Sequence, residues 1–94
     1  MELKQVTKQT CSVYRAVRNS GGYTTVNELA RKTEAVPRTI RNILRRLVTE
    51  GVLEIQIVHG GFRYRVATSM PRESKEQADR IHEAEKIFYP REST

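Results

Sequence analysis

Apolar residues recur at spacings of three and four near the start of the chain, which is the spacing of one helix face. This pattern predicts a helix over residues 3–19. The Ser-Gly-Gly segment at 20–22 should end it, because glycine readily adopts the left-handed conformation that follows helices. A short extended segment, residues 23–24, comes next. The apolar stripe of the first helix consists of Leu3, Val6, Thr10, Val13, Tyr14 and Val17.

Two further helices are predicted from their first residues. Thr25 and Glu28 match a capping box, in which the threonine hydroxyl accepts from the glutamate amide and the carboxylate reaches back to the threonine amide. Pro37 suits the first turn of a helix over residues 37–50, where its missing N–H has no helical partner to lose. Gly51 should end this third helix. The inward residues are Val26, Leu29 and Ala30 in the second helix and Ile40, Ile43, Leu44, Leu47 and Val48 in the third.

A β-hairpin is predicted after the third helix. Residues 52–58 and 62–66 both alternate between apolar and polar side chains, and the first segment is rich in β-branched residues. His59 and the two glycines after it predict the turn. Arg63 and Arg65 share one face of the second strand, and the opposite face consists of Phe62, Tyr64 and Val66.

The composition changes at residues 70–71, and the highly charged segment that follows predicts a last helix over residues 74–88. Because its narrow apolar stripe cannot face water without cost, we expect it to pair across the two-fold axis of a homodimer, helped by Leu3 and Val6. The alternative is that this helix folds back on its own domain. The stripe consists of Ala78, Ile81, Ala84 and Phe88, and Pro90 should end the helix before a frayed tail at 91–94.

Charge is unevenly distributed along the 94 residues, which carry a formal net charge of +6. Residues 1–69 hold 12 basic and 5 acidic side chains, whereas residues 70–94 hold 5 basic and 6 acidic ones. Excess positive charge in the part that looks most folded indicates a polyanion as the partner. With one cysteine and no long apolar run, we expect a single small domain in a reduced, intracellular location, the cytoplasm of a prokaryote or of a viral host.

The order of the predicted elements resembles that of the winged helix-turn-helix. The resemblance is carried by GYTTVNELA at 22–30, VPRTIR at 36–41, Leu44, Leu47 and EGVL at 50–53. Over residues 10–67 the chain is similar to the small winged-helix transcription regulators of bacteria, archaea and their viruses. This resemblance implies an α+β fold with three helices and a two- or three-stranded wing over residues 1–68, and an additional C-terminal helix within residues 69–94.

The third helix predicts contacts with double-stranded DNA through the face opposite its apolar stripe. Arginine can pair bidentately with guanine or hold a phosphate, and asparagine can pair with adenine. The N-terminal half of a recognition helix normally reads the bases. We therefore expect base contacts from Arg38, Arg41, Asn42 and Arg45, and phosphate contacts from Thr39, Arg46 and Thr49. The alternative is a solvated basic face that binds no particular partner.

Additional contacts are expected from the hairpin and the second helix. His59, Arg63 and Arg65 are placed to reach phosphates or a narrow minor groove. The alternative is that these are ordinary polar residues on the outer face of a hairpin. For Arg65, which lies farther from the hairpin tip, this alternative is as well supported as a DNA contact. Arg31 and Lys32, at the end of the second helix, are expected to hold the DNA backbone, which positions a domain without reading sequence.

Catalytic and metal sites find little support. His59 and His82 lie far apart, and neither has a cysteine, serine or acid at the spacing of a catalytic triad. The glycine pairs lack the Lys-Ser/Thr helix start of a phosphate loop. A metal held by His82, Glu83 or Glu85 would need a second subunit. We therefore expect no enzyme activity, no metal and no cofactor.

Cys11 and the tyrosines are interpreted as core residues. Cys11 is expected to be a small buried hydrophobe, and the alternative of a redox switch or intersubunit disulfide requires an exposed thiol. Tyr14, Tyr23 and Tyr64 are expected in the core or at its edge, with an effector pocket as the alternative.

Together these features predict a sequence-specific DNA-binding transcription regulator, and a repressor in preference to an activator, because occluding a promoter needs no polymerase-contacting surface. As a homodimer it would address half-sites about 10 base pairs apart or a multiple of that. The alternatives are a protein-interaction module in a transcription, replication or chromatin assembly, and non-specific packaging of nucleic acid. A DNA reader should leave Arg38, Asn42 and Arg45 exposed and unpaired, whereas an interaction module more often exposes an apolar patch.

Overall fold

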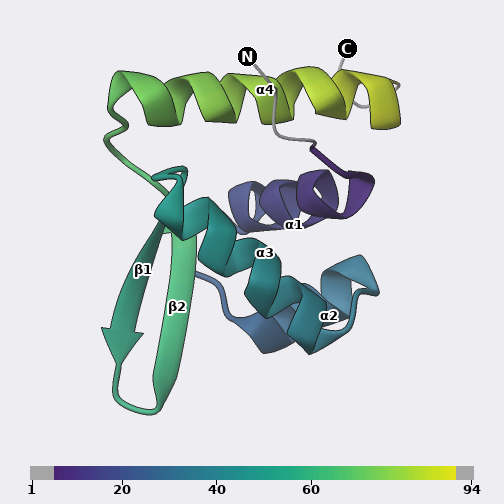
Figure 1. Cartoon of the computed structure of the whole chain (residues 1–94). Helices are drawn as coiled ribbons and strands as arrows, with labels where there is room; N and C mark the ends of the chain where they lie inside the picture. Colours follow the sequence, from purple (N-terminus) through teal and green to yellow (C-terminus); the bar gives the residue numbers. More distant parts are fainter. Residues whose placement is uncertain (1–5, 91–94) are drawn as a thin grey trace.

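The computed structural model describes residues 6–90, and this part of the chain forms four helices and one β-hairpin (Figure 1). This mixed α+β composition and its element order confirm the prediction. Leu3 and the tail at 91–94 lie outside the described residues. The elements are α1 (Lys8–Asn19), α2 (Val26–Thr33), α3 (Pro37–Thr49), β1 (Leu53–Val58), β2 (Gly61–Val66) and α4 (Arg72–Phe88).

The first helix begins later than predicted. Thr7 has extended backbone, and its hydroxyl accepts from the Thr10 amide at 3.1 Å, so it caps the N-terminus of α1. The prediction of one continuous helix from residue 3 is therefore wrong, because a capping side chain overrides the apolar spacing around Val6. The predicted end of the helix is confirmed, since Ser20 is the C-terminal cap and Gly21 follows with a φ of 75°.

The turn between α2 and α3 sets the direction of the third helix. Thr25 caps α2 as predicted, accepting from the Glu28 amide at 3.2 Å, but its hydroxyl, rather than its amide, donates to the Glu28 carboxylate. Glu34 ends α2 with a φ of 61°, a left-handed conformation that is uncommon outside glycine. Pro37 then opens α3 two residues after Ala35, as its position in the sequence predicts.

The junction of α3 and β1 is a Schellman motif built on Gly51. The Val52 amide donates to the Leu47 carbonyl and the Gly51 amide donates to the Val48 carbonyl, both at 3.0 Å. Gly51 adopts a φ of 77°, which a residue with a side chain rarely takes. This motif leaves only three residues between the end of α3 and the start of β1, so the two elements stay side by side.

The hairpin is antiparallel, with Leu53 opposite Val66 and Ile57 opposite Phe62. Thr24 and Tyr64 exchange two backbone hydrogen bonds of 2.8 Å, so the predicted extended segment joins the sheet as a single bridge. That bridge ties the base of the hairpin to the segment that leads into α2. The strands project beyond the helices, as Figure 1 shows.

The core lies between α1, α2, α3 and the base of the hairpin. Within residues 6–90, the apolar residues of the predicted stripes of all three helices lie in this core or pack against it, together with the first residues after α3. Burying each large apolar side chain contributes about 1.5–3 kcal/mol relative to leaving it in water. Its largest fully buried side chains include Tyr14, Val17, Leu29, Ile40, Leu44, Leu47 and Val52.

The last helix packs on α1 within the same chain (Figure 1). Ala78 and Ile81 are buried there, and Ala84 is half-buried against the same core, so these residues follow the folding-back alternative rather than the expected pairing with a second chain. Phe88 is partly exposed and Ile87 is largely exposed at the C-terminal end of α4. A contact with a second copy would have to use this end and the charged outer face of the helix.

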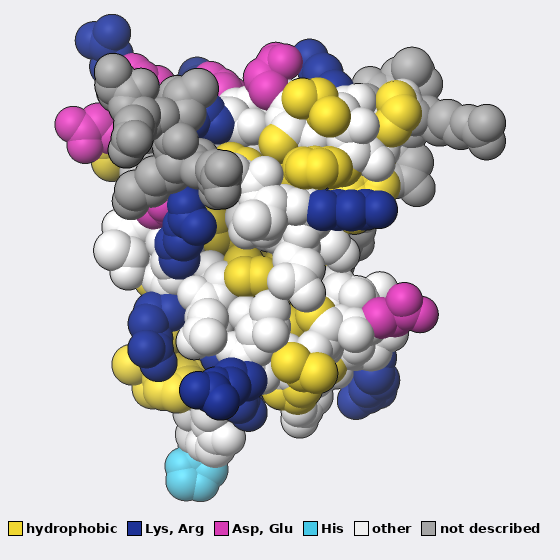
Figure 2. All heavy atoms as spheres, turned by 45° about the vertical axis from the view of Figure 1, so that its right-hand side comes forward, with side chains coloured by type: hydrophobic (Ala, Val, Ile, Leu, Met, Phe, Trp, Pro, Cys, Tyr) yellow, Lys and Arg dark blue, Asp and Glu magenta, His cyan; other side chains and the backbone are white. Residues whose placement is uncertain are grey.

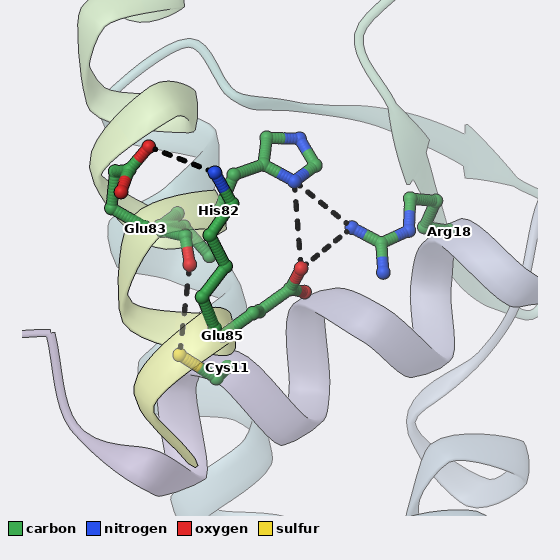
Figure 3. A network of polar contacts seen from close by, with 7 residues as sticks. Cys11, Arg18, His82, Glu83 and Glu85 are labelled. Carbon is green, nitrogen blue, oxygen red and sulfur yellow. Dashed lines mark hydrogen bonds and ion pairs between the residues drawn. The ribbon is translucent and has the colours of Figure 1, made fainter. Parts of the chain in front are cut away.

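A half-buried polar cluster joins α1 to α4 (Figure 3). The Arg18 guanidinium donates to the buried Glu85 carboxylate at 3.0 Å, and His82 Nδ1 lies 3.4 Å from the same oxygen. Glu83 points away from this cluster and pairs with Lys86. Because the Glu85 carboxylate pairs with Arg18, it helps to hold α4 against α1. It is therefore not the unpartnered carboxylate that a metal site would need.

Cys11 is fully buried beside this cluster, with its sulfur 3.9 Å from the Ile81 carbonyl oxygen. Burial, reinforced by the Glu85 carboxylate, raises the pKa of the thiol to about 11. The structure thus confirms the buried-hydrophobe interpretation, and a redox switch lacks the exposed thiol that it requires. Tyr14 and Tyr64 are buried as predicted, whereas Tyr23 is exposed and stacks with Arg65, so its expected place in the core or at its edge is wrong. Among residues 6–90, no helix is long and apolar enough to cross a bilayer.

Candidate nucleic-acid interface

An open groove of about 640 Å³ lies between α3, the hairpin and the first residues of α2. The groove exists because the Gly51 turn keeps the hairpin beside α3 while the Thr24–Tyr64 bridge holds the start of α2 against the hairpin base. None of the described residues that line the groove is acidic. The lining consists of Thr25, Val26, Asn27, Arg41, Arg45, Val48, Thr49, Ile55, Val58, His59, Gly60, Gly61, Phe62, Arg63 and Tyr64.

The basic face of α3 is exposed and unpaired. Its apolar stripe at Ile40 and Leu44 is buried, which turns Arg38, Arg41 and Arg45 outward. Among the described residues, none of these guanidiniums has a hydrogen bond, an ion pair or an aromatic partner. Arg41 and Arg45 point into the groove, whereas Arg38 continues the same stripe toward the N-terminus of α3.

Asn42 is also exposed and has no hydrogen-bonding partner within residues 6–90. It lies on the outer face of α3 between Arg38 and Arg45, outside the groove lining. Arg38, Asn42 and Arg45 are therefore exposed and unpaired, which is the arrangement that the sequence led us to expect of a DNA reader.

The opposite flank of α3 is different. Arg46 is half-buried, and its Nε donates to the Glu50 carboxylate at 3.3 Å, one turn further along the helix. Thr39 is half-buried on the same flank and does not line the groove. Thr49 does line it, although its hydroxyl donates to the Arg45 carbonyl at 2.9 Å. Of the three expected phosphate contacts, only Thr49 thus borders the groove.

The two arginines of the hairpin have separate environments despite sharing one strand face. Arg65 donates to the Glu54 carboxylate at 2.8 Å, and its guanidinium stacks 4.6 Å from the centre of the Tyr23 ring. This hydrogen bond, followed by those from the Thr68 amide and hydroxyl, lowers the pKa of Glu54. Arg63 is exposed, lines the groove and has no partner among the described residues.

His59 occupies the hairpin tip and is exposed at the groove rim. Arg31 and Lys32 are exposed at the far end of α2, away from the groove lining. The start of α2 instead contributes Thr25 and Asn27 to the groove. These two residues were missed from the sequence, although the capping box located this helix start, whose positive dipole end favours anions.

Lys and Arg side chains appear at both ends of the molecule in Figure 2, and those beside the hairpin have no acidic side chain next to them in this view. In the same view most of the acidic side chains lie at the opposite end, along α4. The sequence asymmetry between residues 1–69 and 70–94 thereby becomes an asymmetry in space. A polyanion approaching this face of the molecule meets unpaired arginines and few compensating carboxylates.

The comparison with solved structures finds a protein of similar fold. No protein family model and no curated protein matches this chain. Among solved structures, the chain is similar to BpsR of Bordetella bronchiseptica, a protein whose DNA binding is regulated by 6-hydroxynicotinic acid. The TM-score is 0.61 at 15% sequence identity, with 86% of this chain and 62% of the BpsR chain covered. At this identity the likeness shows a shared fold, and the chain spans less than two thirds of the BpsR length.

Proposed function

We propose that this chain is a winged-helix protein that binds double-stranded DNA and regulates transcription, with α3 in the major groove and the hairpin as the wing. The observation that carries the proposal is the row of exposed guanidiniums of Arg38, Arg41 and Arg45, which have no partner within residues 6–90, beside a groove whose described lining holds no acidic residue. Like charges on one helix face are unfavourable in the free protein. A polyanion removes this repulsion and releases its own counterions on binding.

The two parts of this row have different roles in the proposed complex. Arg38 and Asn42 lie on the outer face of the N-terminal half of α3, where a recognition helix reads base edges. Arg41, Arg45 and Arg63 line the groove from two sides, so they hold the phosphates of the one strand that passes between the helix and the hairpin. Thr25 and Asn27 would contact the same strand from the start of α2.

We also propose that the protein acts as a repressor, because occluding a promoter needs no surface that contacts the polymerase. Dimerisation also remains a proposal. Because Ala78 and Ile81 are buried within the chain, a second copy would have to dock on the end of α4 near Ile87 and Phe88. Sedimentation equilibrium of the parent and of Ile87→Ser tests this contact.

A protein-interaction module is the second candidate, and one observation favours it. Large apolar side chains are exposed on the hairpin, at Ile55, Ile57 and Phe62. They lie beside the arginines of the groove rather than on α3, whose outer face exposes no large apolar side chain among the described residues. This arrangement gives the second candidate less support than DNA binding.

Selection from a pool of randomised duplexes tests the proposed function. We expect one sequence to be enriched by the parent, and Arg38→Ala or Asn42→Ala to relax the preference at one or two positions at a cost of about 1–3 kcal/mol in discrimination. Arg80→Ala, on α4, is the control and should leave the enriched sequence unchanged. If the parent binds duplex DNA weakly and enriches no sequence, the regulator proposal is wrong, and a protein partner should be sought.

A further inference from the structure

The hairpin exposes apolar surface that phosphate binding does not use. Ile57 and Phe62 face each other across the two strands next to the turn, and their side chains are 76% and 54% exposed. Ile55, two pairs closer to the base, lies on the same face and is also exposed. Side chains of this size are rarely left in water as a group unless they meet a partner.

This apolar face is continuous with the basic groove. Ile55 and Phe62 line the groove together with Arg41, Arg45 and Arg63, and Ile57 extends the same face beyond its rim. The partner must therefore carry negative charge where it meets the arginines. Where it meets Ile55, Ile57 and Phe62, its surface must be flat or apolar. The sugars and bases of a nucleic acid, which lie between two rows of phosphates, have this combination of properties. An acidic protein surface would match only the arginines.

The position of the pair relative to α3 selects the minor groove. If α3 occupies a major groove, the phosphate strand beside it runs through the groove between α3 and the hairpin. The next groove of the duplex, on the far side of that strand, is the minor groove, and the hairpin tip lies there. Apolar side chains at such positions unstack a base step and bend the duplex by about 20–90°.

We propose that Ile57 and Phe62 form an apolar wedge that enters the minor groove beside α3 and bends the DNA. This inference rests on the proposed function and deepens it. Bending is cheapest at flexible pyrimidine–purine steps, so the wedge confers a preference for TA or CA at a position that no polar side chain reads. The hairpin is thus a determinant of sequence preference through DNA shape, alongside the direct contacts of α3.

The test uses a duplex of the enriched sequence labelled at its two ends with a donor and an acceptor dye. Binding of the parent should raise the energy transfer between the dyes. Ile57→Ser and Phe62→Ser should abolish most of this rise, lower the affinity about tenfold, and remove the preference for TA over AT at the wedge position. In both variants, the part of the sequence preference that α3 determines should still depend on Arg38 and Asn42.

Gln56→Ser is the matched control, because Gln56 is exposed on the same strand as Ile57 but on the opposite face of the hairpin. It should bind and bend DNA like the parent. Thermal melts of the three variants check that each is folded, which the exposure of the replaced side chains leads us to expect. Arg45→Gln reports separately on the proposed function and should weaken binding.

The outcomes separate the two proposals. If Arg45→Gln weakens binding but the parent does not bend the duplex, or the two wedge variants bend it as the parent does, the wedge is overturned while DNA binding stands. Ile57 and Phe62 would then be candidates for contact with a protein partner. If the parent does not bind the duplex, or Arg45→Gln binds as tightly as the parent, the proposed function itself fails.

Discussion

The Arg65 guanidinium lies 2.8 Å from the Glu54 carboxylate, whereas Arg63, two residues earlier on the same strand face, has no partner within residues 6–90. Two arginines that are equivalent by sequence pattern are therefore unequal in structure. Arg65 is held across the base of the hairpin, where it also stacks on Tyr23. Arg63 lies nearer the tip and lines the basic groove.

This difference predicts unequal effects on DNA binding. Arg63→Gln should weaken binding and reduce the slope of log K against log salt by about 0.9, the value for one phosphate contact. Arg65→Gln should change that slope little, because its charge is already balanced by Glu54. Fluorescence anisotropy with a labelled duplex over a range of salt concentrations measures both. A larger slope change for Arg65→Gln than for Arg63→Gln would contradict these assignments.

The lowered pKa of Glu54 makes the stability of the hairpin depend on pH. Because this pKa is lower in the folded chain than in the unfolded one, the ionised carboxylate stabilises the fold above the ordinary glutamate pKa. That contribution is lost as the pH falls below the ordinary value toward the folded one. Urea unfolding midpoints across this acid range should fall less steeply for Arg65→Met than for the parent. Parallel curves for the two proteins would show that the Glu54–Arg65 contact does not couple to folding.

Cys11 should report on the docking of α4. Its thiol is buried against Ile81 and has a pKa raised to about 11, so it should react with a disulfide reagent at pH 8 about a hundredfold more slowly than in the unfolded chain. Ile81→Ala removes a fully buried side chain of α4 and should cost about 2–5 kcal/mol of unfolding free energy, which loosens α4 where it covers the thiol.

The reaction rate of Cys11 should rise in Ile81→Ala and stay at the parent value in Ile87→Ala, which changes an exposed residue of the same helix. Fast labelling of the native parent would mean that α4 does not cover α1 in solution.

Gly51 should not tolerate a side chain. With its φ of 77°, a Cβ atom there would overlap the Ser74 hydroxyl and lie 3.2 Å from Ser74 Cβ. Gly51→Ala should therefore lower the free energy of unfolding by roughly 1–3 kcal/mol, from backbone strain and from this overlap. Adding Ser74→Ala should restore part of the loss. Gly22→Ala is the control, since a Cβ at Gly22 meets nothing within 4 Å. Equal unfolding free energies for the two glycine variants would contradict the role of the Gly51 turn.

The sequence predicted the elements because their signals are local. The capping box at Thr25, Pro37 at the start of α3 and Gly51 at its end each act within a few residues, and each lies where the pattern placed it. The sequence pattern placed the start of α1 too early, because apolar residues at helical spacing occur before Thr7 as well as after it. The helix begins after Thr7, whose hydroxyl caps its N-terminus.

The candidate site was predictable on α3 but less so elsewhere. Helical spacing alone turns Arg38, Arg41 and Arg45 away from the core. The pairing of Arg65 with Glu54, by contrast, depends on the strand register, and the contribution of Asn27 depends on how α2 meets the hairpin. Whether α4 packs on its own chain is a question of tertiary packing, and a short apolar stripe is compatible with either answer.

The proposed function depends most on Arg41 and Arg45, the two arginines of α3 that line the groove. The direct measurement is the salt dependence of duplex binding for the parent, for Arg41→Gln/Arg45→Gln, and for Arg72→Gln/Arg80→Gln, which removes the same charge from α4. We expect a steep slope for the parent and the α4 variant, and a slope reduced by about two for the α3 variant, close to 0.9 for each lost phosphate contact. Equal slopes for the two double variants would mean that binding follows net charge alone, and that α3 and its groove are not the DNA interface.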